Sequence, residues 1–229
     1  MIETLQHLDS SVFLFFNSAH CDFFDSFMSL YSGRFIWIPT YAALLIVMLR
    51  RYPLARVLCL LVGIALSITI ADQLCASVIR PVFERLRPSN LANPLSEFTH
   101  IVNGYRGGAY GFPSCHAANS FALAVFAATM LRQRSFTIFI LFWAAVNCYS
   151  RIYLGVHYPG DLLVGALIGS AIGYLCCRAS VAVFDRFFSE GRFGGSSPVL
   201  ASSHPIRKIN LMEIVAIFTI IYIIIASLV

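Results

Sequence analysis

Basic, imidazole and carboxylate side chains recur in three short segments, and their types and spacing suit phosphoryl transfer. The segments cover residues 80–88, 113–116 and 150–161. Arginine keeps its charge and presents a planar fork of donors that fits phosphate oxygens, whereas neighbouring arginines repel one another unless an anion lies between them. We therefore predict a cage for a phosphoryl group, built by Arg80, Arg87 and Arg151.

The third segment also carries a histidine and an aspartate four residues apart. These are His157 and Asp161, and Pro159 between them suits the first turn of a helix. At this spacing the Asp161 carboxylate can accept a hydrogen bond from one imidazole nitrogen and leave the other as a neutral nucleophile. His116 can then protonate the leaving oxygen as a general acid. Two histidines in opposite protonation states predict a bell-shaped pH profile.

The helix expected after the second segment offers another kind of phosphate ligand. Ser114 and His116 lie at its N-terminus, where free backbone amides and the helix dipole favour phosphate. The nearby acids are Glu84, Glu97 and Asp161, and they do not form the cluster that holds magnesium. We therefore expect arginines and amides to neutralise the phosphate, with no metal and no cofactor.

The elements that position these side chains must lie in a membrane. Hydrophobic residues make up 59% of the 229 residues and charged residues 12%, against roughly 25% charged residues in soluble domains. The mean hydropathy is +0.78. This composition excludes a soluble globular protein and an intrinsically disordered one. We predict an all-α polytopic membrane bundle of about six transmembrane helices, at about 35–49, 55–79, 116–131, 135–153, 160–183 and 209–228.

The pattern along the chain predicts one membrane domain with appended segments. Residues 1–33 are apolar but interrupted by acids, which indicates amphipathic helices lying in the interface. Residues 34–184 form the expected five-span core that carries the three segments. A cytoplasmic loop at 185–208 and a C-terminal transmembrane helix at 209–229 complete the chain.

The distribution of basic residues predicts the orientation. Ten lysines and arginines fall in the segments 49–56, 132–134 and 178–208, and six fall on the opposite side, including the three cage arginines. Basic residues accumulate on the cytoplasmic side of membrane proteins. We therefore expect a multi-pass protein of the cell (inner) membrane, with its site facing the periplasm or exterior.

In their order and spacing, the three segments resemble the signature of the type 2 phosphatidic acid phosphatase superfamily, which includes vanadium haloperoxidases. The family pattern is K-x6-R-P, then P-S-G-H, then S-R-x5-H-x3-D. The chain has R-x6-R-P from residue 80, P-S-C-H from residue 113 and S-R-x5-H-x3-D from residue 150. The match covers residues 80–161, about a third of the chain, and three ordered motifs with fixed spacings are a specific signal.

The resemblance implies a role for each site residue. His157 would form a phospho-histidine intermediate and Asp161 would orient it, while His116 would be the general acid. The substrate-binding residues would be Arg80, Arg87, Ser114, Cys115 and Arg151.

Two positions depart from the family pattern. Arg80 replaces a lysine, which keeps the charge but exchanges a point donor for a fork and so could shift substrate fit or rate. Cys115 replaces a glycine and adds a Cβ where the backbone should approach phosphate. Cysteine is tolerable there if the position is helical, whereas a required positive φ would distort the site.

The sequence thus predicts an integral-membrane lipid phosphatase that hydrolyses a phosphomonoester or pyrophosphate without a metal. Lipid A phosphate and undecaprenyl pyrophosphate rank first as substrates. The alternative is a lipid-phosphate transporter or flippase that binds the headgroup without hydrolysis. The expected partners are the membrane and a phosphorylated membrane lipid, with no nucleic acid, and the oligomeric state stays open.

A few residues outside the motifs also lead to predictions. Asp72, in the second span, is either a partner of one of the arginines or a helix-end residue with access to water. Trp37, Tyr41 and Tyr153 are expected in the aromatic belt at the membrane interface. Gly107, Gly108 and Gly111 indicate a flexible loop before Pro113, which is either a permissive turn, the favoured interpretation, or a lid over the headgroup.

Overall fold

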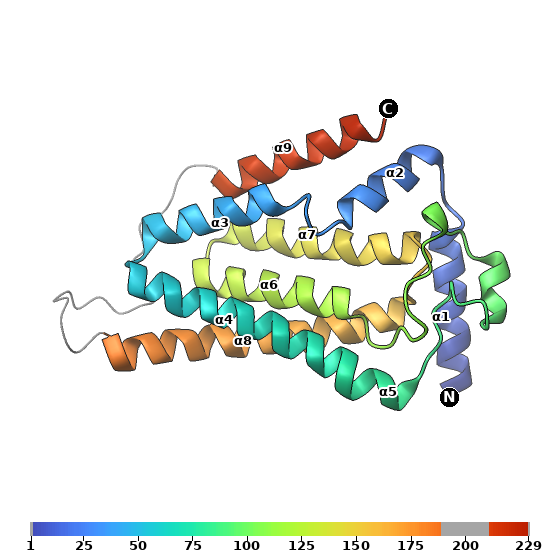
Figure 1. Cartoon of the computed structure of the whole chain (residues 1–229), viewed down its shortest axis with the longest axis horizontal. Coiled ribbons are helices and arrows are strands. Elements are labelled where there is room, and N and C mark those ends of the chain that lie inside the picture. The colour runs from blue at the N-terminus through green and yellow to red at the C-terminus, as the bar shows by residue number, and fades with distance from the viewer. Residues whose placement is uncertain (1, 189–210, 229) are drawn as a thin grey trace.

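The computed structural model describes residues 2–188 and 211–228, and these ranges fold into helices joined by turns and one long loop (Figure 1). The long helices run nearly parallel to one another, and both ends of the bundle carry the connections. The elements are α1 (Ile2–Asn17), α2 (Asp22–Tyr31), α3 (Ile38–Arg51), α4 (Leu54–Gln73), the π-helical turn η1 (Leu74–Ile79), α5 (Arg80–Phe83), the 3-10 turns η2 (Pro94–Phe98) and η3 (Val102–Gly104), α6 (Cys115–Leu131), α7 (Arg134–Tyr153), α8 (Pro159–Phe188) and α9 (Leu211–Ala226).

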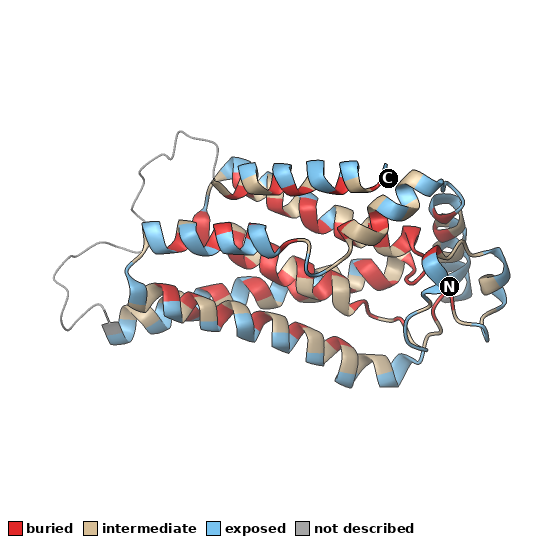
Figure 2. Cartoon of the chain, turned by 45° about the horizontal axis from the view of Figure 1, so that its top comes forward, coloured by how far each residue is buried: buried red, intermediate tan, exposed pale blue. Residues whose placement is uncertain are grey.

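Helix α6 lies at the centre of the bundle and packs against α4, α7 and α8. Buried residues gather on the faces that the helices turn toward one another, and exposed residues cover the outer faces (Figure 2). Many exposed residues are large and apolar, such as Leu66 on α4, Leu167 on α8 and Phe218 on α9. A surface of this kind faces lipid rather than water.

The prediction of an all-α membrane bundle is confirmed. Within the described residues, three stretches are long and apolar enough to cross a membrane, namely Leu54–Phe83, Arg134–Tyr153 and Pro159–Phe187, while α6 and α9 are shorter apolar helices. The number of six spans stays a prediction.

Helices α6 and α8 approach each other closely through glycines on α8. Gly165, Gly169 and Gly173 recur every four residues, so they share one face of the helix. A Cβ added at any of them would collide with backbone of the Ser114–Ala122 stretch. Small residues at this spacing let two helix backbones meet in a membrane. This packing fixes the start of α6 beside the start of α8.

The helical stretch of the second predicted span continues past its predicted end at residue 79, as far as Phe83. The π-helical turn η1 joins α4 to α5, and Arg80 opens that last helical turn. Glu84 then ends the helix in the left-handed conformation, with φ 43°. A π-turn inserts an extra residue into the helical repeat and so re-aims the side chains that follow it.

Helix α1 lies across one end of the bundle (Figure 1). Its Phe13 is fully buried and meets the Tyr158 ring edge-on, with ring centroids 5.5 Å apart. The proposed interfacial character of residues 1–33 stays a prediction, as do the other segment boundaries. Most of the predicted loop at 185–208, from residue 189 onward, lies outside the described residues.

The prediction of interface aromatics is wrong for Trp37 and Tyr153, and it stays a prediction for Tyr41, which is 37% exposed. Trp37 is 1% exposed and donates from Nε1 to the Tyr31 carbonyl oxygen at 2.8 Å. Tyr153 is equally buried, and its hydroxyl lies 2.6 Å from Asp25 Oδ1. The Trp37 ring packs between Tyr31 of α2 and Trp143 of α7, and α2 also supplies the Asp25 that meets Tyr153. The amphipathic character of a ring does not reveal which neighbour will cover it.

Candidate active site

His157 lies in the turn between α7 and α8 and is 3% exposed. Its Nε2 is 2.9 Å from Arg87 Nη1, and its Nδ1 is 3.4 Å from Asp161 Oδ2. Because a guanidinium can only donate, Nε2 must be the acceptor in the first contact. The ring proton therefore sits on Nδ1 and points to Asp161, which leaves a lone pair on Nε2.

Asp161 lies in the first turn of α8, where it is fully buried and held from several sides. Its Oδ2 accepts from the Tyr158 backbone N–H at 3.1 Å, and its Oδ1 accepts from Arg85 Nη1 at 2.9 Å. The other Arg85 nitrogen, Nη2, is 2.8 Å from Asp9 Oδ2 on α1. Asp9 Oδ1 also accepts from the Gly160 N–H at 2.7 Å. The carboxylate that orients His157 is thus tied to the N-terminal helix through Arg85.

Arg85 and Arg87 reach the site from one extended segment. The Arg87 N–H donates to the Ala109 carbonyl at 3.1 Å, and the Gly111 N–H donates to the Arg85 carbonyl at 2.9 Å. This short antiparallel pairing sets residues 85 and 87 on one face, since side chains alternate along a strand. A Cβ at Gly111 would lie 3.0 Å from Asp161 Oδ2, so glycine is what allows the segment to pack this closely.

The second segment packs directly against the third. Ser114 caps α6, its Oγ accepting from the Ala117 N–H at 3.3 Å, and its own N–H donates to the Asp161 carbonyl at 3.0 Å. Cys115 is the first residue of α6, so its position is helical and not left-handed. Arg80 Nη2 lies 2.9 Å from Cys115 Sγ and 3.0 Å from the Pro113 carbonyl oxygen. The two departures from the family pattern therefore touch each other.

Four cationic or imidazole side chains come together around His157. Burial lowers the pKa of His157 well below its ordinary value, and the positive charges of Arg87, Arg151 and Arg80 lower it further. The pKa of Arg87 falls to about 10 because it is buried and faces Arg80 and Arg151. His116 also lies close enough to disfavour a charge on His157. Such a concentration of positive charge is suited to an anion.

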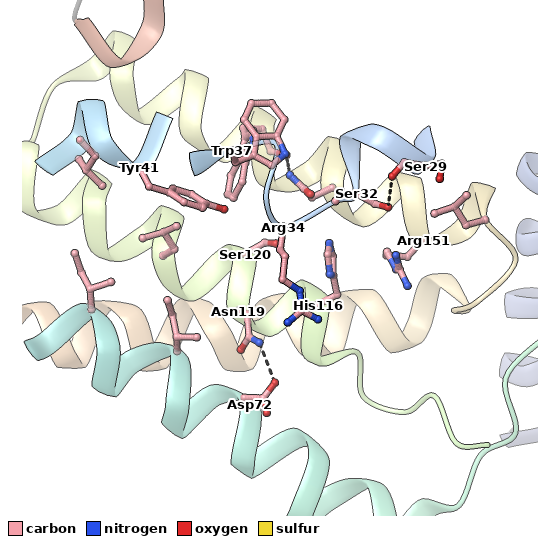
Figure 3. Close-up of a pocket in the computed structure, with 18 of the residues that line it drawn as sticks. Ser29, Ser32, Arg34, Trp37, Tyr41, Asp72, His116, Asn119, Ser120 and Arg151 are labelled. Carbon is pink, nitrogen blue, oxygen red and sulfur yellow. Dashed lines mark hydrogen bonds between the residues drawn. The ribbon is translucent and has the colours of Figure 1, made fainter. Parts of the chain in front are cut away.

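His116 and Arg151 open onto a large cavity (Figure 3). The cavity has a volume of about 960 Å³ and extends from these two residues between α3 and α4. His116 Nε2 and Arg151 Nε are buried and have no hydrogen-bond partner within the described part of the chain. The donors that face the cavity are thus available to a ligand.

The far end of the cavity is apolar. It is lined by Leu44 and Met48 from α3 and by Leu61 and Ile64 from α4, while its near end is lined by polar side chains. A space that is polar at one end and apolar at the other fits an amphiphile whose tail lies among the helices.

Four residues that line or support the site were not predicted for it: Asp9, Arg34, Arg85 and Asn119. Arg85 had a usable signal, since it stands two residues before Arg87. Asp72 was considered as an arginine partner, but its carboxylate accepts from Asn119 Nδ2 at 2.9 Å and forms no ion pair with an arginine of the described chain. The positions of Asp9 and Arg34 near the site depend on how α1 and the α2–α3 connection pack, and they leave no pattern in the sequence.

Metal ligands do not gather in this site. Across residues 2–188 and 211–228, no three histidine, cysteine, aspartate or glutamate side chains are grouped so as to hold a metal ion. The charged groups facing His157 are instead the arginines described above.

Comparison with known proteins agrees with the motif positions. The PAP2 superfamily matches residues 56–185. A lipid A 4'-phosphatase of Bacteroides thetaiotaomicron is 53% identical over 175 residues, which cover 76% of this chain and 78% of that protein. A lipid A 4'-phosphatase of Porphyromonas gingivalis is 33% identical over 89% of this chain and 82% of the relative.

A more distant relative and a solved structure extend the comparison. An undecaprenyl-diphosphatase of Sulfolobus acidocaldarius is 33% identical over 65% of this chain and 66% of the relative. The crystal structure of Aquifex aeolicus LpxE superposes with a TM-score of 0.55 at 24% identity, covering 73% of this chain and 93% of that one. At that identity the superposition shows a shared fold.

Proposed function

Because the chain belongs to the PAP2 superfamily and is a membrane lipid phosphatase, we propose that it removes the 4'-phosphate of lipid A through a phospho-histidine intermediate. The observation that supports a lipid substrate is the cavity, which begins at His116 and Arg151 and ends among apolar side chains of α3 and α4. The two lipid A 4'-phosphatase relatives support this particular lipid.

In the first step, His157 Nε2 attacks the phosphorus atom in line with the leaving oxygen. The N–P bond forms as the P–O bond to the lipid breaks, and His116 gives its proton to the departing sugar oxygen. Asp161 holds the Nδ1 proton and stabilises the positive charge that develops on the ring. Arg87 Nη1 contacts His157 Nε2 in this structure, and it donates to a phosphoryl oxygen instead when the substrate phosphate lies beside His157.

In the second step, water attacks the phosphorus atom and the N–P bond breaks. His116, now neutral, accepts the proton of the water, and inorganic phosphate leaves. Arg80, Arg87 and Arg151 balance the charge of the equatorial oxygens, and the free amides at the start of α6 add donors. Ser114 and Cys115 contribute through this helix start, where Ser114 is the cap and Arg80 rests on Cys115 Sγ.

Undecaprenyl pyrophosphate is the second candidate substrate, because an undecaprenyl-diphosphatase is among the relatives. It needs the same anion cage and an apolar groove, so the cage does not separate the two lipids. What differs is the group between the transferred phosphate and the tail, which is a sugar in lipid A and the proximal phosphate in the prenyl lipid.

The site is proposed to face the periplasm from the inner membrane. The basic turns at Arg50–Arg51 and Arg132–Arg134 lie at the end of the bundle opposite α1 and the site (Figure 1). An excess of basic residues at one end marks it as cytoplasmic, so the site belongs on the other side.

The test is phosphate release from a panel of purified lipids in detergent micelles. The panel holds lipid A, undecaprenyl pyrophosphate and phosphatidic acid, with wild type compared with His157→Asn. We expect lipid A to give the highest kcat/KM, a product that lacks the 4'-phosphate, and no release by the variant. Lipid A left intact while another lipid is hydrolysed would contradict this substrate, and full activity in His157→Asn would contradict the intermediate.

A further inference from the structure

Three polar side chains lie in the cavity beside His116, and none belongs to the three motifs: Arg34 from the connection between α2 and α3, Asp72 from α4 and Asn119 from α6 (Figure 3). They come from three different elements and converge on one part of the cavity. Arg34 also lies outside residues 56–185, which the family matches. It is therefore not part of the region that the family model covers.

These groups retain unused hydrogen-bonding capacity. Asn119 Nδ2 donates to Asp72 Oδ1 at 2.9 Å, but Asn119 Oδ1 is buried and has no partner in the described chain. No hydrogen bond or ion pair joins Arg34 to any described residue. A buried polar atom without a partner is costly unless a ligand or water satisfies it, and an aspartate within a membrane helix adds to that cost.

The position of the cluster says which part of a lipid it meets. His116 and Arg151 lie on its one side, and Leu44, Leu61 and Ile64 lie on its other side in the same cavity. A lipid with its phosphate at His116 and its tail among the leucines must place its connecting group beside Arg34, Asp72 and Asn119. A glycerol ester, or the proximal phosphate of a prenyl pyrophosphate, offers no ring hydroxyls at this point and would leave the acceptors of Asp72 and Asn119 without donors.

We propose that Arg34, Asp72 and Asn119 form a subsite for the sugar ring that carries the phosphate. Resting on the proposed function, this assigns the choice of substrate to a hydroxyl-bearing carbohydrate headgroup. Asp72 and Asn119 Oδ1 accept from ring hydroxyls, and Arg34 donates to a ring hydroxyl or an amide carbonyl oxygen. A site built to bind hydroxyls discriminates strongly against a substrate that lacks them, because its own polar groups are then left unpaired.

The experiment compares two substrates in each of four proteins. The substrates are lipid A, which presents a sugar, and undecaprenyl pyrophosphate, which does not, and the measurement is the ratio of their kcat/KM values. The proteins are wild type, Asn119→Leu, Arg34→Gln and Arg50→Gln. Arg50→Gln is the matched control, because it removes an exposed arginine at the other end of the bundle. Arg34 is also exposed, so its variant decides the matter if Asn119→Leu does not fold.

We expect the ratio to fall about 10- to 100-fold in Asn119→Leu and about 10-fold in Arg34→Gln, and to stay at the wild-type value in Arg50→Gln. If wild type hydrolyses lipid A but both variants keep its ratio, the subsite is overturned and the proposed function stands. If wild type hydrolyses only the prenyl lipid, both are overturned. An equal fall in the control would also overturn the assignment, since it would reflect the loss of any arginine.

Discussion

Replacing Gly111 by alanine tests whether the tight packing of the loop onto the reacting residues controls the rate. The added Cβ would lie 3.0 Å from Asp161 Oδ2, 3.1 Å from Arg87 Cγ and 3.5 Å from His157 Nδ1. The first two distances are below ordinary van der Waals contact. Gly111 does not have a positive φ, so the backbone itself accepts alanine.

The expected loss follows from the size of the displacement. Asp161 is held by the Tyr158 N–H and by Arg85, so the loop and Arg87 must yield by a few tenths of an ångström. A misplacement of 1 Å costs about 100-fold in rate, so a few tenths should lower kcat roughly 3- to 10-fold. Overpacking of this kind should also cost about 1–3 kcal/mol of stability. The contact between His157 Nδ1 and Asp161 Oδ2 is already 3.4 Å long, so it is the most sensitive to this displacement.

Phosphate release at saturating lipid A measures kcat, and a thermal melt in the same detergent measures stability. Gly108→Ala is the control, since it lies in the same loop and a Cβ there meets nothing within 4 Å. Both substitutions restrict the unfolded chain equally, so their difference reports the contact alone. Wild-type kcat and stability in Gly111→Ala would refute the reasoning.

Three further outcomes are expected. Arg85→Met should lower kcat about 10- to 100-fold and leave KM nearly unchanged, because it removes the cation that pairs with the buried Asp161 carboxylate. Restored activity in Arg85→Lys would distinguish this effect from misfolding, and an unchanged kcat in Arg85→Met would show that the Arg85–Asp161 ion pair does not contribute to catalysis. On the acid side of the pH profile, kcat/KM should fall only well below pH ~6.5, the ordinary histidine pKa, because only neutral His157 attacks and burial and Arg87 lower its pKa. A fall of kcat/KM that begins at or above that pH would contradict a neutral buried nucleophile. EDTA should leave the rate unchanged, since arginines balance the phosphoryl charge, and strict dependence on added magnesium would refute the arginine cage.

The Asp9–Arg85–Asp161 connection links the first helix to the chemistry. Asp9 and Arg85 join α1 to the start of α8, and Asp9 also holds the Gly160 N–H. Two of these side chains are partly exposed: 15% of the Asp9 side chain and 22% of the Arg85 side chain is accessible to solvent. Asp9, in the middle of α1, is thus connected through Arg85 to the buried carboxylate of Asp161, which orients His157.

The sequence by itself determined the membrane bundle, the positions of its long helices and the three motif segments. Composition alone excluded a soluble fold, because so few charged residues cannot cover a water-exposed surface. The order and spacing of His116, Arg151, His157 and Asp161 indicated phosphoryl transfer, since the helices that carry them were readable from their apolar runs. These inferences depend on local sequence, where a residue and its neighbours along the chain decide the outcome.

Tertiary structure decided what lies beside the motifs. Trp37 and Tyr153 are buried because α2 and its neighbours cover them. Asp72 meets Asn119 rather than an arginine, and Asp9 meets Arg85 across 76 positions of chain. The cavity with Arg34 depends on how α3 and α4 diverge. Contacts between distant segments are set by how helices pack, and a hydropathy pattern defines which face is apolar but not which neighbour that face will meet.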